Sequence, residues 1–309
     1  MAKETRTVRL IVPATTANLG PGFDCLGMAL QWYNSIEISE TSENKAGLTI
    51  EGPEATEDIP RDRSNLTLRA VERVFSLAGV QMPPLWIRVT VTTPLARGLG
   101  SSASAIVGGM AAANAFLGNP LGREQLVAEM INMEGHPDNV VACFFGGLTA
   151  SLVTNSDVYV RKYYPAETLR CVLVIPDYQL ATAKSRRVLP RTLPIKDAIF
   201  NMARIPFVID KICSGDVSGL DVIMDDRLHQ PHRRKLIPEY DVVESVAMGA
   251  GAAAVCLSGS GPTMLALTEE AKAENVATSL REALQRLGRN FSLHVVAPDS
   301  LGVRQAEEN

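Results

Sequence analysis

The fold of this chain is decided by one stretch, Pro94-Leu95-Ala96-Arg97-Gly98-Leu99-Gly100-Ser101-Ser102-Ala103-Ser104. A β-rich run at 86–91 precedes it, and an alanine-rich, almost wholly apolar segment at 102–117 follows it. This order predicts a strand, a glycine–serine loop and a buried helix. Glycines let a backbone approach an anion closely, and a helix N-terminus offers unpaired N–H groups. The stretch therefore predicts a phosphate-binding loop.

The two serines after the glycines add hydroxyl groups to this loop. Ser101 and Ser102 can cap the helix, contact phosphate oxygens or bind Mg2+. The simpler alternative is an ordinary N-cap after an ordinary turn, because glycine-rich turns before helices are common. The loop lacks the G-x-x-x-x-G-K-[ST] pattern, and no lysine follows its glycines, so it is not a Walker P-loop. A different nucleotide-binding scaffold is needed.

Outward from the loop, the chain divides into two parts with different patterns. The first part has predicted strands at 8–12, ending at Pro13, and at 47–51, a helix at 65–78, and a polar loop at 51–63. After about Arg161 we predict strands at 171–175, 253–257, 263–267 and 291–296, and helices at 199–213, 242–248 and 271–287. We expect two α+β domains, residues 1–160 and 161–309, which meet near residues 155–170.

Composition argues against several classes of function. The chain has 309 residues, 46% of them hydrophobic, and a net charge of -4 without a basic run, which argues against nucleic-acid and anionic-membrane partners. Its five cysteines are scattered and form no C-x-x-C pair, which predicts a reducing compartment with neither a disulfide framework nor a zinc site. The start of the chain lacks a signal-peptide pattern, and no apolar run reaches the roughly 18 to 20 residues that span a bilayer. We expect a cytoplasmic protein.

Three motifs together resemble one known superfamily. Residues 94–103 match P-x-x-x-G-L-G-S-S-A, which is similar to the phosphate-binding motif of the GHMP kinases. Residues 13–24, P-A-T-T-A-N-L-G-P-G-F-D, resemble the first motif in its homoserine kinase form, and residues 258–263, S-G-S-G-P-T, resemble the third. Order and spacing match over essentially the whole chain. The resemblance implies an N-terminal domain like domain 2 of ribosomal protein S5, a ferredoxin-like C-terminal domain, and an active site in the cleft between them.

A polar segment at a predicted helix end narrows the substrate. It reads Glu134-Gly135-His136-Pro137-Asp138-Asn139, which by composition alone could be a solvated helix terminus. The segment resembles the homoserine kinase form E-G-H-P-D-N. By that resemblance Glu134 holds Mg2+ with Ser102 nearby, since the ion must shield the β- and γ-phosphates of ATP. Some relatives insert residues before the histidine, so Glu129 is an alternative ligand.

Two arginine-bearing segments resemble the homoserine kinase forms A-R-x-x-L-P and P-Y-R-x-x-L-x-P. They select Arg186 and Arg233 over the arginine that follows each, although Ser185 and His232 depart from the family's Ala and Tyr. A guanidinium fork suits bidentate recognition of a carboxylate. Outside this family context, a basic cluster is usually a solvated face.

The resemblance also assigns the remaining substrate contacts. Asp24 is expected to hold the substrate ammonium group, and three further side chains are expected to hydrogen-bond its polar groups: Asn18, His136 and Asn139. Taken alone, Asp24 and Asn18 in a Gly-Pro-rich loop would be turn formers. In the third motif, Gly259 and Gly261 are expected to let the backbone pack closely against the nucleotide loop.

The reaction implied is in-line transfer of the ATP γ-phosphoryl group to the hydroxyl of L-homoserine, giving O-phospho-L-homoserine and ADP in threonine biosynthesis. Catalytic candidates are Glu134, Asp138 and Asn139. Several relatives use an Asp with a nearby Lys as the base, and Asp138 occupies that position, but the segment contains no obvious lysine. We hypothesise that Asn139 orients the hydroxyl and that a phosphate oxygen takes the proton late. A homodimer is expected from the habit of the family.

Three alternatives remain. Another GHMP kinase, acting on mevalonate or a sugar alcohol, is disfavoured by the paired arginines and the E-G-H-P-D-N segment. A regulatory protein that binds nucleotide without catalysis is disfavoured by Glu134 and Ser102, because a mere binder needs no metal chemistry. A mevalonate-type decarboxylase also consumes ATP, but nothing in the sequence suggests its substrate.

Overall fold

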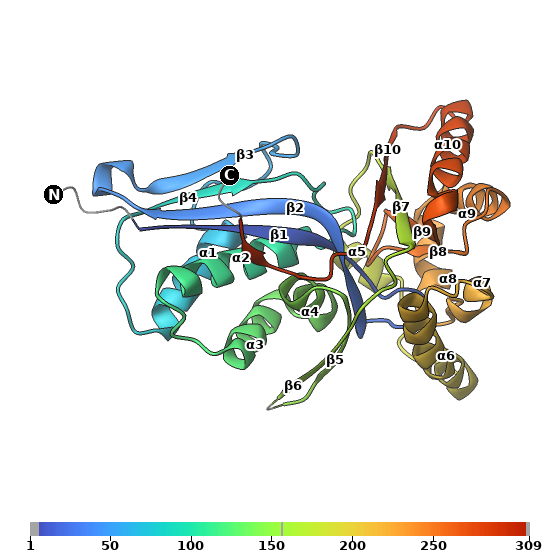
Figure 1. Ribbon diagram of the computed structural model, residues 1–309, viewed down its shortest axis with the longest axis horizontal. Helices are drawn as coiled ribbons and strands as arrows, with labels where there is room; N and C mark the ends of the chain where they lie inside the picture. The colour runs from blue at the N-terminus through green and yellow to red at the C-terminus, as the bar shows by residue number, and fades with distance from the viewer. Residues whose placement is uncertain (1–5, 156, 307–309) are drawn as a thin grey trace.

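The structure is a computed structural model that describes residues 6–155 and 157–306, and it contains two β-sheets with associated helices (Figure 1). The strands of the first sheet are β1 (Thr7–Ala17), β2 (Leu26–Glu40), β3 (Gly47–Glu51), β4 (Leu85–Thr90), β5 (Leu148–Val153), β6 (Val158–Tyr163) and β11 (Arg304–Gln305). Their order is β11-β1-β2-β4-β3, and the hairpin β5–β6 joins β2. β3 runs parallel to β4, and the other pairs are antiparallel.

Four helices cover one face of the first sheet: α1 (Leu66–Leu77), α2 (Ser101–Phe116), α3 (Arg123–Glu134) and α4 (Pro137–Phe145) (Figure 1). α2 is buried between the sheet and α1, as its apolar sequence predicts. It fits there because two of its residues lack side chains: a Cβ on Gly108 would lie 2.3 Å from Ile36, and one on Gly109 would lie 2.7 Å from the Thr67 carbonyl oxygen. The helix that follows the phosphate loop is therefore fixed in position by its neighbours.

The second sheet contains β7 (Leu169–Pro176), β8 (Ala254–Leu257), β9 (Met264–Glu269) and β10 (Phe291–Val296), in the order β10-β7-β9-β8. Its helices are α5 (Thr182–Arg187), α6 (Ile195–Ser214), α7 (Leu220–Ile223), α8 (Gln230–Arg233), α9 (Tyr240–Gly249) and α10 (Glu270–Arg286). The strands alternate with helices as βαββαβ, which confirms the ferredoxin-like expectation. The predicted α+β fold class is also confirmed.

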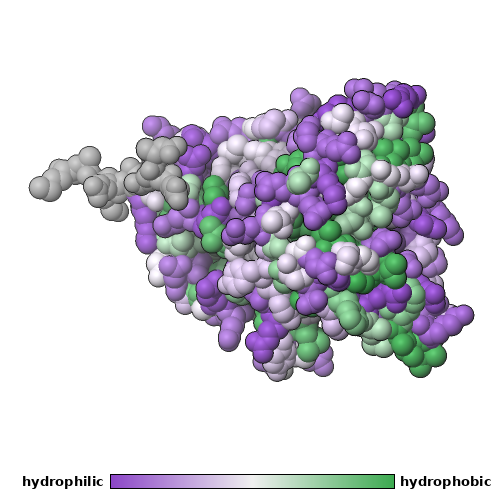
Figure 2. Space-filling view, turned by 45° about the vertical axis from the view of Figure 1, so that its right-hand side comes forward, coloured by the Kyte–Doolittle hydropathy of each residue, from purple (hydrophilic) through white to green (hydrophobic). Residues whose placement is uncertain are grey.

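The two sheets share part of their hydrophobic core. α9 and α10 pack on one face of the second sheet, and α6 and α7 pack on the other. The hydrophobic cluster formed with α6 and α7 also contains Leu26 and Leu30 of β2, so the first sheet contributes to it. Hydrophilic residues predominate on the outer face seen in Figure 2, with hydrophobic residues in smaller groups between them. No helix of the described residues is both long and apolar enough to cross a membrane.

Two predicted boundaries are wrong. The first strand was expected to end at Pro13, but β1 continues to Ala17 because the register with β2 shifts between Pro13 and Ala14. Such a bulge accommodates a proline, which has no N–H to donate to the ladder. The segment 161–309 was expected to form one domain, but β11 at its end pairs with β1 of the first sheet. The chain passes from the first sheet to the second between Tyr163 and Leu169.

The other predicted helices and strands are present, with ends that differ by up to a few residues. The longest strand of the described chain, β2, has no counterpart among the predictions. Its residues 35–39 alternate polar and apolar side chains, which is the signal that could have predicted it. The hairpin β5–β6 was also missed.

Candidate active site

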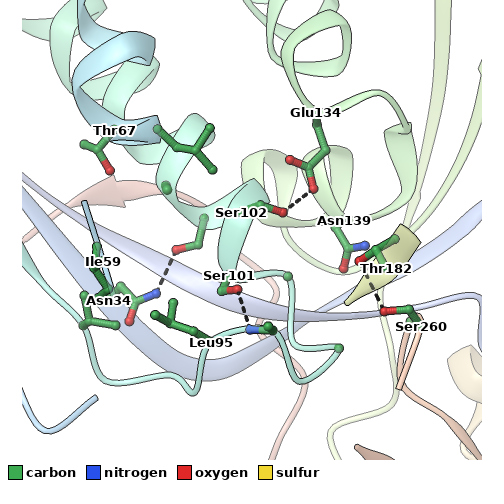
Figure 3. A pocket seen from close by; sticks show the side chains of 18 of the residues that line it. Asn34, Ile59, Thr67, Leu95, Ser101, Ser102, Glu134, Asn139, Thr182 and Ser260 are labelled. Atoms are coloured by element: carbon green, nitrogen blue, oxygen red, sulfur yellow. Dashed lines mark hydrogen bonds between the residues drawn. The ribbon is translucent and has the colours of Figure 1, made fainter. Parts of the chain in front are cut away.

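A cavity of about 480 Å3 lies between the two sheets and is lined by residues of both parts of the chain. Figure 3 shows its length: Asn34, Ile59, Thr67 and Leu95 lie at one end, Ser101 and Ser102 in the middle, and Asn139, Thr182 and Ser260 at the other. Residues of all three sequence motifs line it, together with α5 and α8. The cleft expected between two domains is therefore present.

The phosphate loop is shaped by two glycines in the left-handed region. Gly98 has φ 78° and Gly100 has φ 67°. A Cβ on Gly98 would lie 2.2 Å from the Ser258 carbonyl oxygen, and one on Gly100 would lie 1.9 Å from Thr15 Oγ1. Only glycine satisfies both the backbone angle and this close approach. The third motif packs closely against the loop, as expected of Gly259 and Gly261: Ser258 Oγ donates to the Gly98 carbonyl at 2.6 Å, and a Cβ on Gly259 would lie 3.4 Å from that carbonyl oxygen.

The loop serines do not cap α2. The N-cap residue is Gly100, which has no side chain, and α2 begins at Ser101. Ser101 Oγ lies 3.4 Å from the backbone nitrogen of Ala96, within the loop. Ser102 Oγ donates to Glu134 Oε1 at 2.6 Å, as Figure 3 shows. The first turn of α2 therefore faces the cavity without a capping side chain.

Glu134 is a buried carboxylate at the C-terminus of α3, and its side chain is only 6% exposed. Burial raises its pKa, and the hydrogen bond from Ser102 and the charge of His136 only partly oppose that shift. Glu129, the alternative metal ligand, instead pairs with Arg73 of α1 at 2.8 Å and does not line the cavity. The structure thus brings Glu134 and Ser102 together and leaves Glu129 outside.

The segment after Glu134 forms a hydrogen-bonded cluster. His136 Nδ1 lies 2.6 Å from Asp138 Oδ1, which also accepts from the backbone N–H of Asn139 at 2.8 Å. Thr15 Oγ1 donates to Asn139 Oδ1 at 2.8 Å. Burial would lower the pKa of His136, but the hydrogen bond and charges of Asp138 and Glu134 outweigh it and raise the pKa. Asp138 is buried and already accepts two strong hydrogen bonds, and no lysine is among the described residues that line the cavity.

The two selected arginines line the cavity, whereas Arg187 and Arg234 are exposed. Arg186 forms a fork with Asp24, with N–O distances of 2.8 and 2.9 Å. This hydrogen bond raises the pKa of Arg186. Arg233 is only 2% exposed and donates to the Gly259 carbonyl at 3.1 Å. Burial, together with the neighbouring charge of Arg186, lowers the pKa of Arg233 to about 10.

Asn18 lines the cavity but also holds the framework together. Its Nδ2 donates to the Gly259 carbonyl at 2.8 Å, and its Oδ1 accepts from the backbone N–H of Asp24 at 3.0 Å. Its φ of 72° fits the turn former that its sequence context predicts, and its predicted contact with the substrate stays a prediction. The first and third motifs are linked directly through this amide.

The sequence analysis missed the apolar end of the cavity. Its lining is formed by side chains from β2, β3, β4 and the loop before α1, among them Ile36, Ile50, Ile59 and Val89, beside the predicted Leu95 of the phosphate loop. Asn34 anchors this end, because its Nδ2 donates to Ser104 Oγ at 2.9 Å and its Oδ1 accepts from the Thr92 N–H at 2.8 Å. Ile36, Ile50 and Val89 lie in ordinary strands and Ile59 lies in a loop, so no motif marks them.

Two family models match the chain. The GHMP kinases N terminal domain covers residues 65–147, and the GHMP kinases C terminal model covers residues 208–286. The first includes the phosphate loop and the E-G-H-P-D-N segment. The two models lie in the two parts of the chain that the sheets separate.

Individual relatives match over nearly the full length. The chain is 42% identical to the homoserine kinase of Moorella thermoacetica over 291 residues, which cover 94% of this chain and 97% of the relative. It is 41% identical to that of Carboxydothermus hydrogenoformans over 295 residues, with 96% and 95% covered. The crystal structure of homoserine kinase from Cytophaga hutchinsonii has a TM-score of 0.88 at 25% identity and covers 99% of both chains. The crystal structure of L. major mevalonate kinase in complex with R-mevalonate has a TM-score of 0.72 at 16% identity, covers 96% of this chain and 98% of that chain, and shares the fold.

Proposed function

Since this chain belongs to the homoserine kinase family within the GHMP kinases, we propose how its residues carry out that family's reaction. The reaction is transfer of the γ-phosphoryl group of ATP to the hydroxyl of L-homoserine, which gives O-phospho-L-homoserine for threonine biosynthesis. Such transfers depend mainly on positioning and charge stabilisation. Each part of the cavity has a distinct role in this scheme.

ATP would lie along the cavity from its apolar end to the phosphate loop. The aliphatic lining near Ile36, Ile59 and Val89 suits a nucleobase, which has a large flat apolar surface. The N-terminus of α2 and the N–H groups of the glycine loop suit the phosphates. This orientation leaves the γ-phosphate near Ser102 and Glu134.

A divalent cation fits the pair formed by Ser102 and Glu134. Their oxygens are 2.6 Å apart. The pKa of Glu134 is raised because the hydrogen bond from Ser102 and the charge of His136 compensate only part of the cost of burying its negative charge. Mg2+ is usually held by one or two protein oxygens together with substrate phosphates. When bound, it supplies charge shielding at the β- and γ-phosphates.

The acceptor site would be formed by Asp24, Arg186 and Arg233. An amino-acid alcohol is a zwitterion, with one carboxylate and one ammonium group. The Arg186–Asp24 pair is about one-third exposed on each side, so the zwitterion can insert between the partners. The substrate carboxylate would pair with the Arg186 guanidinium and the substrate ammonium group would pair with Asp24, which preserves the charge balance.

Asn139 would orient the acceptor hydroxyl toward the γ-phosphate. Its side-chain Oδ1 accepts from Thr15 at 2.8 Å and its Nδ2 donates to Asp138 Oδ1 at 3.3 Å, so the side-chain amide has a fixed orientation. Asp138 is engaged by His136 as well, which favours a positioning role for it over that of a free base. The proton would then pass late to a phosphate oxygen.

The observation that carries this proposal is the bidentate Arg186–Asp24 pair on the same cavity as the Ser102–Glu134 pair. The test is an ADP-release assay with Mg2+ and ATP that compares L-homoserine with mevalonate, galactose and L-threonine. We expect selective turnover of homoserine that Arg186→Ala lowers at least about 100-fold in kcat/KM, and that the exposed control Arg187→Ala leaves within about twofold. Equal loss in both variants would refute the assignment of Arg186. The cytoplasmic location and the homodimer stay predictions.

A further inference from the structure

Phe23 lies next to Asp24 and beneath both arginines of the acceptor site. The guanidinium carbon of Arg186 is 5.6 Å from the centre of the Phe23 ring, and that of Arg233 is 5.0 Å away. An aromatic face attracts a cation within about 6 Å. Two like charges are therefore held close together over one ring, which offsets part of their mutual repulsion.

His229, the residue just before α8, packs against the ring of Phe23. It is fully buried, and its ring stacks on Phe23 with a centroid distance of 5.1 Å and an angle of 26°. Its Nε2 lies 2.9 Å from the Gly20 carbonyl oxygen, and its Nδ1 lies 3.4 Å from Arg233 Nη1. A carbonyl only accepts and a guanidinium only donates, so Nε2 carries the hydrogen and Nδ1 accepts. One tautomer of His229 thus links the first motif to Arg233.

The His229 backbone is fixed as well. Asp226 Oδ2 accepts from the N–H of His229 at 3.0 Å and from that of Gln230 at 2.6 Å. Asp226 Oδ1 in turn accepts from Asn201 of α6 at 2.6 Å. Phe23 and His229 do not line the cavity, whereas Asp24, Arg186 and Arg233 do. The pair lies behind the acceptor site and is anchored to three separate segments.

We propose that Phe23 and His229 form a positioning platform that holds Arg186 and Arg233 at a fixed separation and so selects acceptor alcohols that carry a carboxylate. This inference rests on the proposed function of the two arginines. Neither residue touches the acceptor or the nucleotide. Both act through the guanidinium groups, so their loss affects recognition of the carboxylate and leaves the nucleotide end of the cavity unchanged.

The experiment measures discrimination between two acceptors. L-Homoserine is compared with 3-aminopropan-1-ol, which is the same molecule without its carboxylate. The variants are Phe23→Leu, which keeps an apolar side chain but removes the ring, Phe23→Tyr, which keeps the ring, and His229→Leu. We expect Phe23→Leu and His229→Leu to raise the KM for homoserine about tenfold and to lower the preference for homoserine over 3-aminopropan-1-ol by a similar factor. The KM for ATP stays within about twofold, and Phe23→Tyr stays near the wild type.

A matched control exists on α6. Phe200 also lies under two arginines, with Arg204 and Arg227 at 3.2 and 3.8 Å from its ring, and it does not line the cavity. Phe200→Leu is expected to leave the acceptor preference unchanged. The platform is refuted if Phe23→Leu lowers kcat/KM for both acceptors by the same factor, or if Phe200→Leu changes the preference equally. A wild-type enzyme that does not prefer homoserine would instead overturn the proposed function.

Discussion

Glu134 is a residue at which catalysis and stability oppose each other. Burial raises its pKa, so its ionised form costs folding free energy in the unliganded protein. We expect Glu134→Gln to lower kcat at least about 100-fold and to raise the Mg2+ concentration needed for half-maximal activity. The same variant should unfold at a higher urea concentration than the wild type at pH 7.

The pH dependence of that difference follows from the sign of the shift. Below the pKa that Glu134 has in the unfolded chain, Glu134 is protonated in both the folded and the unfolded state. Ionisation then adds little to the difference in stability between the wild type and Glu134→Gln. As pH rises, the unfolded state loses its proton first, so the wild type loses stability until the raised pKa of the folded state is passed. The urea midpoints of Glu134→Gln and the wild type, measured from pH 4 to pH 8, should therefore differ more as the pH rises, with the variant's midpoint the higher of the two. A constant difference across this range would contradict the buried-charge explanation.

Asp138 tests how the acceptor proton is handled. Its carboxylate already accepts from His136 and from the N–H of Asn139. An amide oxygen can keep those two bonds, so we expect Asp138→Asn to retain at least about one-tenth of the wild-type kcat. Loss of nearly all turnover, in a variant that folds and binds ATP normally, would show that Asp138 is the base. The control is Asn139→Ala, for which a larger fall in kcat is expected.

Single residues of the site were predictable where a family motif surrounds them. Arg186 and Arg233 were selected over their neighbours by motif position alone, and both line the cavity. Their contacts were not predictable, because Arg186 and Asp24 lie 162 positions apart. Residues such as Ile36 and Val89 were missed because aliphatic side chains in strands look the same whether they line a cavity or fill a core.

At the scale of elements, the phosphate loop and the third motif form one unit. Gly98 has φ 78°, and a Cβ there would lie 2.2 Å from the Ser258 carbonyl oxygen. We expect Gly98→Ala to lower the free energy of unfolding by about 3 kcal/mol and to raise the KM for ATP at least about tenfold. Urea unfolding and steady-state kinetics measure the two effects.

Gly249 of α9 provides the control for that substitution. It lies in open space, with no heavy atom within 4 Å of a Cβ built on it, and it is helical. Alanine there should stabilise the protein by about 0.5 to 1 kcal/mol and leave the KM for ATP unchanged. If Gly98→Ala behaved like Gly249→Ala, close packing would not be what requires a glycine in the loop.

Most elements were predictable from periodicity, and the exceptions have a physical cause. α1 follows its pattern closely, with Asn65 capping it through bonds to the N–H groups of Thr67 and Leu68. β2 was missed although it is the longest strand, because it follows a turn rich in glycine and proline that dominates the local signal. Its pairing with β1, β4 and β5 is a long-range property that no local window contains.

At the scale of the whole molecule, the chain connects its two sheets at two places. It crosses first between β6 and β7, and again after β10, where the tail returns to β1. Asp299 anchors this tail: it is 2% exposed and accepts from Tyr33, the N–H groups of Leu301 and Gly302, and Arg304. We expect Asp299→Asn to lower the free energy of unfolding by about 3 kcal/mol. Asp221→Asn, at an exposed position of α7, should change it by less than about 0.5 kcal/mol.

The tail and the shared core together predict that both sheets unfold in one transition. Trp32 of β2 lies 4.2 Å from His294 of β10 between ring centroids, so its fluorescence reports on the junction of the sheets. In a Trp86→Phe background Trp32 is the remaining tryptophan, because the chain has two. Urea curves from this fluorescence and from far-UV circular dichroism should coincide, and Asp299→Asn should shift both midpoints equally. An earlier fluorescence transition would show that the sheets separate before they unfold, and that closure of the cavity is a loose docking of two independent domains.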